Sequence, residues 1–128
     1  IVMDDATVAE VLHADGRLVR NEESAAWIRA NVPVTDRVWV MCASSSLYAE
    51  ARRDPPVRYL WFAYYRAVPE ALEEARALLT GPDRAEWVVQ VQDPATCDPS
   101  GALAGLLERG YEPVGSATGW PVWHRLPG

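Results

Sequence analysis

The stretch VWVMCASSSLYAEARR, residues 38–53, decides how this chain is expected to fold. It begins with a continuous apolar run, continues through three serines and ends in a segment with helical composition. An unbroken apolar run of this length is typical of a strand that is covered on both faces. A buried strand that leads directly into a helix is the repeating unit of α/β proteins.

The segment before this strand predicts a helix over residues 21–32. Asn21 is a good N-cap, and Pro33 ends the helix because proline disfavours helical geometry in the residue before it. Ala26, Trp27 and Ala30 share one face of this helix and are expected to form its apolar side.

Helical and strand patterns keep alternating to the end of the chain. The expected elements are a helix over 47–53, a strand over 58–65, a helix over 69–79, a strand over 86–93, a helix over 102–109 closed by Gly110, and strands over 111–118 and 122–126. This order predicts a single α/β domain over residues 21–128. We expect a Rossmann-like, three-layer α-β-α sandwich with a mostly parallel sheet of about 4–5 strands and an antiparallel hairpin at its C-terminal edge. Residues 1–20 form an N-terminal extension, whose sequence pattern is equally typical of a short helix and of a small hairpin.

The composition excludes several classes of function. The chain has 128 residues, the length of one domain, and a net charge of −6. A nucleic-acid partner is not expected, because phosphate backbones are bound by basic faces. Cys42 and Cys97 are too few for a zinc site or a disulfide framework. Cys42 is most simply a small core side chain, although a bridge to Cys97 remains open.

Ser44, Ser45 and Ser46 follow the buried strand and are the first candidate site. A phosphate loop requires glycines, and a P-loop also requires a lysine, but this stretch has no glycine and the chain has no lysine. A nucleophile elbow would read G-x-S-x-G, which CASSSL does not match. The serines are therefore expected to cap the next helix, with a ligand at the C-terminal ends of the strands as the alternative.

Two further groups are candidates for contact with a ligand or a sugar acceptor. Asp93 directly follows a buried strand, where α/β proteins often bind ligands, although Asp-Pro is also an ordinary turn opening. Arg58, Trp61 and Tyr64 lie together in VRYLWFAYYR. They are suited either to stacking on a sugar or lipid headgroup, or to packing one aromatic face of an edge strand on the core.

No set of residues predicts catalysis. His13 and His124 are the only histidines, and both read as structural side chains. The adjacent acids, such as Glu22 and Glu23, fall in polar runs and point in different directions on a helix. We therefore expect no catalytic residue, no metal site and no cofactor in this chain.

Four segments resemble the C-terminal soluble domain of bacterial integral-membrane GT-C glycosyltransferases, the dolichyl-phosphate-mannose-mannosyltransferase-like family. They are AAWIRANVPVTDRVWV (25–40), SSLYAEARRDPPVRYLW (45–61), AEWVVQVQD (85–93) and LLERGYEPVG (106–115). The family pattern is a helix, a turn with proline and aspartate, a strand, a tyrosine-containing helix with an arginine-rich end, and later a leucine-rich helix ending in tyrosine. Cys42 and Ser44 depart from it, since glycine or other residues are common there.

The resemblance implies a non-catalytic accessory domain on the extracytoplasmic face of the cell membrane. In that family the catalytic acid lies in a loop between membrane helices, and the sugar donor is carried on a polyprenyl phosphate. The expected partners are the membrane-embedded part of the same polypeptide, for which the opening at Ile1 leaves room, and a glycan or lipid-linked sugar. Residues 1–20 would then be a juxtamembrane segment. The alternative is a freestanding α/β module that binds a nucleotide or sugar phosphate.

Overall fold

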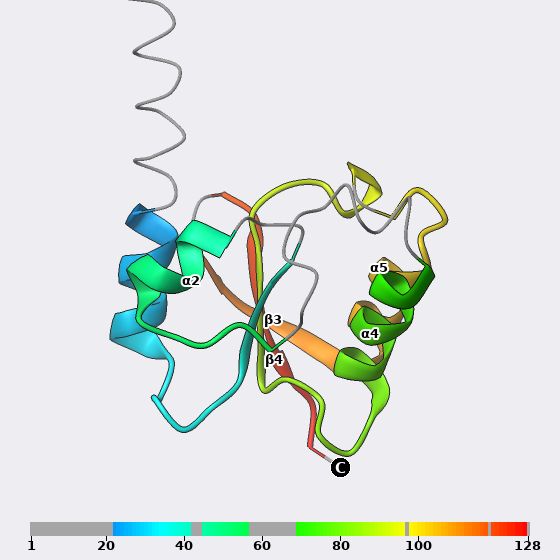
Figure 1. The fold of residues 1–128 in the computed structure, drawn as a ribbon, viewed down its shortest axis with the longest axis horizontal. Coiled ribbons are helices and arrows are strands. Elements are labelled where there is room, and N and C mark those ends of the chain that lie inside the picture. Colours follow the sequence, from blue (N-terminus) through cyan, green and yellow to red (C-terminus); the bar gives the residue numbers. More distant parts are fainter. Residues whose placement is uncertain (1–21, 42–44, 57–68, 97, 118, 128) are drawn as a thin grey trace, which may run out of the picture.

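The computed structural model describes residues 22–41, 45–56, 69–96, 98–117 and 119–127. These residues form a mixed α/β fold with one open four-stranded sheet (Figure 1). The elements are a helix over residues 22–31, β1 (Val38–Met41), α2 (Ser45–Ala51), α4 (Pro69–Thr80), β2 (Trp87–Gln90), the 3-10 turn η1 (Pro94–Thr96), α5 (Ala102–Gly110), β3 (Tyr111–Ser116) and β4 (Pro121–Arg125). The strand expected over 58–65 and the extension over 1–20 lie outside the described residues.

The strand order β1-β2-β4-β3 makes the sheet mixed. β1 and β2 pair in parallel, whereas β4 is antiparallel to both β2 and β3. The C-terminal antiparallel hairpin is thus confirmed, but the expected mostly parallel sheet is not supported, because only one of these three pairings is parallel. The reason lies in the path after β2. α5 leads directly into β3, which lies two strand positions from β2, and β4 turns back to fill the position between them.

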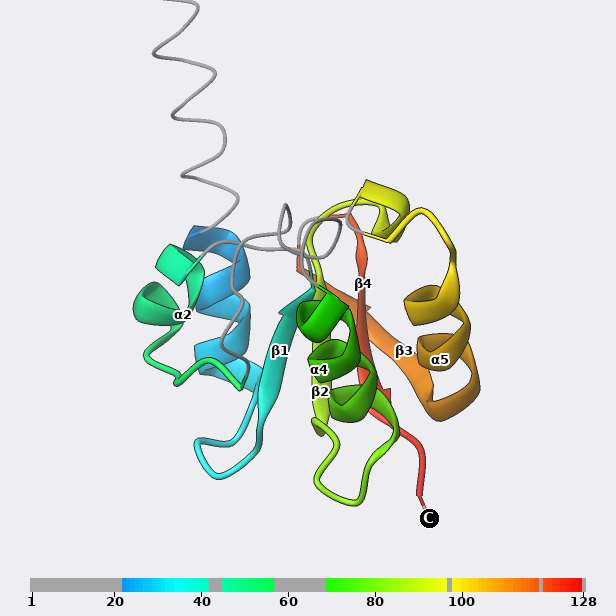
Figure 2. The ribbon, with the colours of Figure 1, turned by 45° about the vertical axis from the view of Figure 1, so that its right-hand side comes forward.

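Both faces of the sheet carry apolar clusters. The α4 and α5 side buries Trp39 and Met41 of β1, and the opposite side, with the helix over 22–31 and α2, buries Val38 and Val40 (Figure 2). All four β1 side chains are at most 2% exposed. At about 25 cal/mol per Å² of apolar surface, each fully buried Val or Met side chain contributes roughly 1.5–3 kcal/mol. The two-sided burial predicted for this strand is therefore confirmed.

The helix over residues 22–31 turns a different face to the sheet from the one expected. Ala25 and Ile28 are fully buried, whereas Ala26 and Ala30 are exposed and only Trp27 is half-buried. Ala25, Ile28 and Val32 share the buried face at i, i+3 and i+7 spacing and belong to one apolar cluster, against which Trp27 packs partly buried.

α5 ends without the glycine turn that was expected. Gly110 is the last helical residue, and Tyr111 follows in extended conformation, its N–H donating to the carbonyl of Leu107. Since Gly110 is not in the left-handed region, the chain passes from α5 into β3 with no intervening loop.

β3 is an outer strand of the sheet in the described part of the chain. Five of its six residues are exposed, and its register with β4 shifts between Pro113 and Gly115. Proline provides no N–H for a ladder, and a bulge bends the strand locally. A Cβ atom added at Gly115 would lie 3.4 Å from the Trp27 ring, so β3 passes close to the helix over 22–31.

α2 ends at a strained residue. Arg52 has a φ of 57°, in the left-handed region that favours glycine, and the Arg53 N–H donates to the Tyr48 carbonyl at 3.0 Å. This is the six-to-one hydrogen bond of a helix C-terminal motif in which glycine is the usual left-handed residue. Arginine here costs about 1 kcal/mol relative to glycine.

Arg52→Gly is therefore expected to raise the free energy of unfolding by about 0.5–1 kcal/mol in urea denaturation, because glycine relieves the left-handed strain. Arg52→Ala is the matched control, since it removes the same exposed side chain but retains a Cβ. Equal stability of the two variants would show that strain at this position does not govern stability.

Candidate functional site

The C-terminal ends of β1 and β2 form the edge of the sheet where the sequence predicts a site. α2 begins at Ser45, so the backbones of Ser45 and Ser46 lie in its first turn, and the capping of this helix by a serine hydroxyl stays a prediction. Ser44, like Arg58, Trp61 and Tyr64, lies outside the described residues. Whether the aromatic and serine residues form one site therefore stays a prediction.

Asp93 performs a structural task at this edge. Its side chain is exposed, and Oδ1 accepts a hydrogen bond of 2.9 Å from the Ala95 N–H. An aspartate that bonds to the backbone two residues ahead is an ordinary turn device, here opening η1. The turn interpretation of Asp93 fits this geometry.

Asp98 is the buried acid that the sequence reading missed. It is 5% exposed, and its Oδ2 accepts a 2.8 Å hydrogen bond from the Leu103 N–H in the first turn of α5. Its Oδ1 accepts hydrogen bonds from the Ser100 N–H and hydroxyl. Gly101, at the N-cap position itself, has no side chain to cap the helix, so Asp98 supplies the cap from three residues earlier.

Opposing effects set the pKa of Asp98. Burial alone would raise this pKa, but the hydrogen bonds from Leu103 and Ser100 and the charge of Arg76 together lower it below its ordinary value of 3.8. The carboxylate is therefore ionised at neutral pH and serves as a helix cap. The sequence DPSG (residues 98–101) directly before the leucine-rich helix could have indicated that Asp98 caps this helix.

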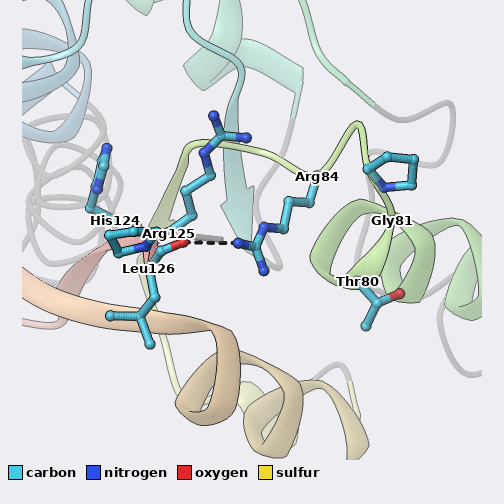
Figure 3. Close-up of a pocket in the computed structure, with 8 residues that line it drawn as sticks. Thr80, Gly81, Arg84, His124, Arg125 and Leu126 are labelled. Atoms are coloured by element: carbon cyan, nitrogen blue, oxygen red, sulfur yellow. Dashed lines mark hydrogen bonds between the residues drawn. The ribbon is translucent and has the colours of Figure 1, made fainter.

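A second, more concave region lies at the opposite edge of the sheet, beside the N-terminal end of β2 and the C-terminal end of β4 (Figure 3). The hollow has a volume of about 430 Å³. We call it the basic hollow, and it is lined by Thr80, Gly81, Pro82, Arg84, His124, Arg125, Leu126 and Pro127. The sequence analysis did not anticipate it, because its walls come from a loop after α4 and from the end of the chain.

The two arginines of the basic hollow are held differently. Figure 3 shows the Arg84 side chain extending to the Leu126 carbonyl, to which Nη2 donates at 2.8 Å. Arg125 is anchored through its backbone, since its N–H donates to the Glu86 carbonyl at 2.9 Å. Both side chains are half-buried. The hollow thus gathers positive charge on a chain whose net charge is −6.

Tyr111 lies near enough to Arg84 and Arg125 for their charges to influence its phenol. It is 2% exposed, and its hydroxyl donates a 2.6 Å hydrogen bond to the Ala85 carbonyl. Burial raises the pKa of Tyr111 to about 12, against the lowering influence of Arg84, Arg125 and Arg37, while Glu86 adds to the rise. The neutral phenol therefore acts as a hydrogen-bond donor that joins β3 to the start of β2.

Aromatic rings lie along the sheet beside the hollow. Trp87 and His124 are cross-strand neighbours whose rings meet edge to face with centroids 4.6 Å apart. Trp27 meets Trp87 in the same manner at 6.0 Å. Such contacts contribute about 0.5–1.5 kcal/mol each beyond area burial. His124 thus packs edge to face on Trp87 and also lines the basic hollow.

The described residues contain no cluster of three or more His, Cys, Asp or Glu side chains that could hold a metal ion. Within the same residues, each helix is too short or too polar to cross a bilayer. Comparison with family models, curated proteins and solved structures gives no match to this chain.

Asp98→Ala is expected to lower the free energy of unfolding by about 2–3 kcal/mol, because it leaves the Leu103 and Ser100 donors without their buried acceptor. Asp93→Ala, the control, removes one exposed turn bond and is expected to cost less than about 1 kcal/mol. Urea denaturation of the two variants at pH 7 measures both. Equal losses would contradict the assignment of Asp98 as the cap of α5.

Tyr111 is expected to make stability fall above pH 10. In the unfolded chain its phenol ionises near the ordinary pKa of 10.0, whereas in the folded chain it stays protonated to about 12. The unfolded state therefore binds fewer protons in this window, and rising pH favours unfolding, by about 2 kcal/mol at pH 12. The stability advantage of the wild type over Tyr111→Phe should shrink between pH 9 and pH 12. A constant difference would contradict this.

Proposed function

We propose that this chain is a non-catalytic accessory domain of a membrane glycosyltransferase that uses a polyprenyl-phosphate-linked sugar, and that it lies on the extracytoplasmic face of the membrane. The observation that carries the proposal concerns the polar residues that give the chain its resemblance to the GT-C family. Asp36, Tyr48, Arg53 and Tyr111 each bond to a different element of the scaffold.

The first pair holds β1 in place. Asp36, in the turn before β1, accepts a 2.9 Å hydrogen bond at Oδ2 from the Trp87 indole N–H of β2. The Tyr48 hydroxyl, from α2, accepts a 2.8 Å hydrogen bond from the buried Val40 N–H of β1. A buried N–H without a partner would cost about 1–3 kcal/mol. The tyrosine in this helix is therefore explained by the architecture.

The second pair joins more distant parts of the chain. The Arg53 guanidinium, beyond the end of α2, donates from Nη2 to the Val32 carbonyl at 2.7 Å, which ties α2 to the end of the helix over 22–31. Tyr111 joins the end of α5 to Ala85. All four motif residues thus form hydrogen bonds that connect different elements of the fold. This is expected of a domain whose role depends on its structure rather than on catalysis.

The order of elements also supports the proposal. The described structure has a helix, a turn with Pro33 and Asp36, a strand, a tyrosine-containing helix and a leucine-rich helix ending at a tyrosine. With helices on both sides of the sheet, we assign the finer architecture as a three-layer α-β-α sandwich of Rossmann-like character. The partner in this proposal is the membrane-embedded part of the same polypeptide, and a glycan or lipid-linked sugar is the substrate handled there.

Cell fractionation tests the location and the parent protein. An antibody raised against the 128-residue chain is used to probe native cells. It should detect a band far larger than 14.2 kDa that sediments with membranes and requires detergent for release. Protease added outside spheroplasts should remove the signal, with a cytoplasmic protein as the protected control.

A band near 14 kDa in the soluble fraction would overturn the accessory-domain proposal. It would favour the alternative, a freestanding module that binds a nucleotide or sugar phosphate. A large membrane band protected from external protease would retain the membrane partner but contradict the extracytoplasmic location.

A further inference from the structure

The basic hollow has the form of a small-ligand site. Its volume of about 430 Å³ falls within the range of roughly 300–1,000 Å³ typical of ligand pockets. Pro82, Leu126 and Pro127 supply apolar walls, and Arg84 and Arg125 supply charge. A concave surface with apolar walls and a few convergent charged groups is the usual composition of such sites.

Arg125 has unused hydrogen-bonding capacity. Its guanidinium carries five N–H donors, and none of them bonds to, or pairs with, any residue in the described part of the chain. The side chain is nevertheless half-buried, which removes part of its hydration. A guanidinium in such surroundings favours an anionic partner with oxygen acceptors, because charge-assisted bonds are about twice as strong as neutral ones.

The negative groups nearby do not supply that partner. Glu86 accepts the Arg37 N–H through its carboxylate and the Arg125 N–H through its backbone carbonyl. α4 and α5 both end beside the hollow, so their C-terminal carbonyls present partial negative charge. The Gly110 carbonyl already accepts from the Leu126 N–H, and the Leu126 carbonyl from Arg84. The Arg125 fork remains without an acceptor among these groups.

We propose that the basic hollow binds a phosphate-type oxyanion, held by the guanidinium of Arg125. Tetrahedral oxyanions suit this arrangement because the planar donor fork of arginine matches two of their oxygens. The ligand class comprises a phosphate monoester or diester, carried either by a small soluble molecule or by a lipid headgroup. This site is independent of the accessory-domain proposal, because it is a property of the isolated chain.

Titration of the 128-residue chain with sodium phosphate and sodium pyrophosphate, at constant ionic strength, tests the proposal by amide chemical shifts. We expect saturable shifts at Arg84, Arg125 and Leu126, with a Kd on the order of 1 mM, the strength of two charge-assisted hydrogen bonds. The Nε–Hε resonance of Arg125 in the wild-type chain gives a readout that requires no variant.

Arg125→Gln is expected to weaken binding by about tenfold or more. Arg109→Gln is the matched control, because it removes the same charge from an exposed position in the last turn of α5 that does not line the hollow. Equal weakening by both variants would indicate nonspecific charge attraction and overturn the site, as would shifts that sodium chloride alone reproduces.

A flotation assay distinguishes the two sources of phosphate. Phosphatidylcholine vesicles with and without phosphatidic acid are mixed with the chain. Retention on the phosphatidic acid vesicles that inorganic phosphate competes away assigns the site to a lipid headgroup. Saturable phosphate binding without retention assigns it to a soluble phosphate ester. Absence of both overturns the proposal, and neither result depends on where the chain resides in the cell.

Discussion

The burial of β1 on both faces is the constraint on which the rest of the structure depends. Its four side chains alternate between the two apolar clusters, and a strand buried in this way requires a helical layer on each side. Neither layer can be lost without exposing part of β1 to water. The hydrogen bond that connects β1 to α2 follows from the same requirement. Because β1 is inaccessible to water, its Val40 N–H needs a protein partner, which the Tyr48 hydroxyl provides. Asp36, in the turn before β1, accepts a hydrogen bond from the Trp87 indole N–H of β2.

The type of each described α-helix and strand, but not of the 3-10 turn η1, was predictable from sequence, because hydrophobic periodicity and proline or glycine signals are local. The arrangement of the strands was not. β4 lies between β2 and β3 because α5 crosses one strand position before β3 begins, and no local pattern in residues 111–126 specifies that distance. The prediction of which face of the helix over 22–31 is buried was also wrong, for a related reason. The prediction was built around Trp27, whereas the buried face is formed by Ala25, Ile28 and Val32.

At the edge where α/β proteins usually bind ligands, Asp93 and Asp98 both bond to the backbone. Asp93 opens a turn, and Asp98 caps α5. The basic hollow lies at the other edge and joins Arg84 to Arg125, which are far apart in sequence. Their proximity depends on the pairing of β4 with β2, which is the part of the topology that the sequence did not predict. Because the sequence left the strand order open, it gave no indication that Arg84 and Arg125 line one hollow.

The exposed edge of the outer strand β3 affects whether copies of this chain can aggregate by extending their sheets. Its bulge and the missing N–H of Pro113 break the row of donors and acceptors that another chain would need in order to extend the sheet. Gly115, held against Trp27, adds no side chain that an incoming strand could pack upon. Neighbouring copies should therefore not polymerise by adding strands to β3, even at high concentration.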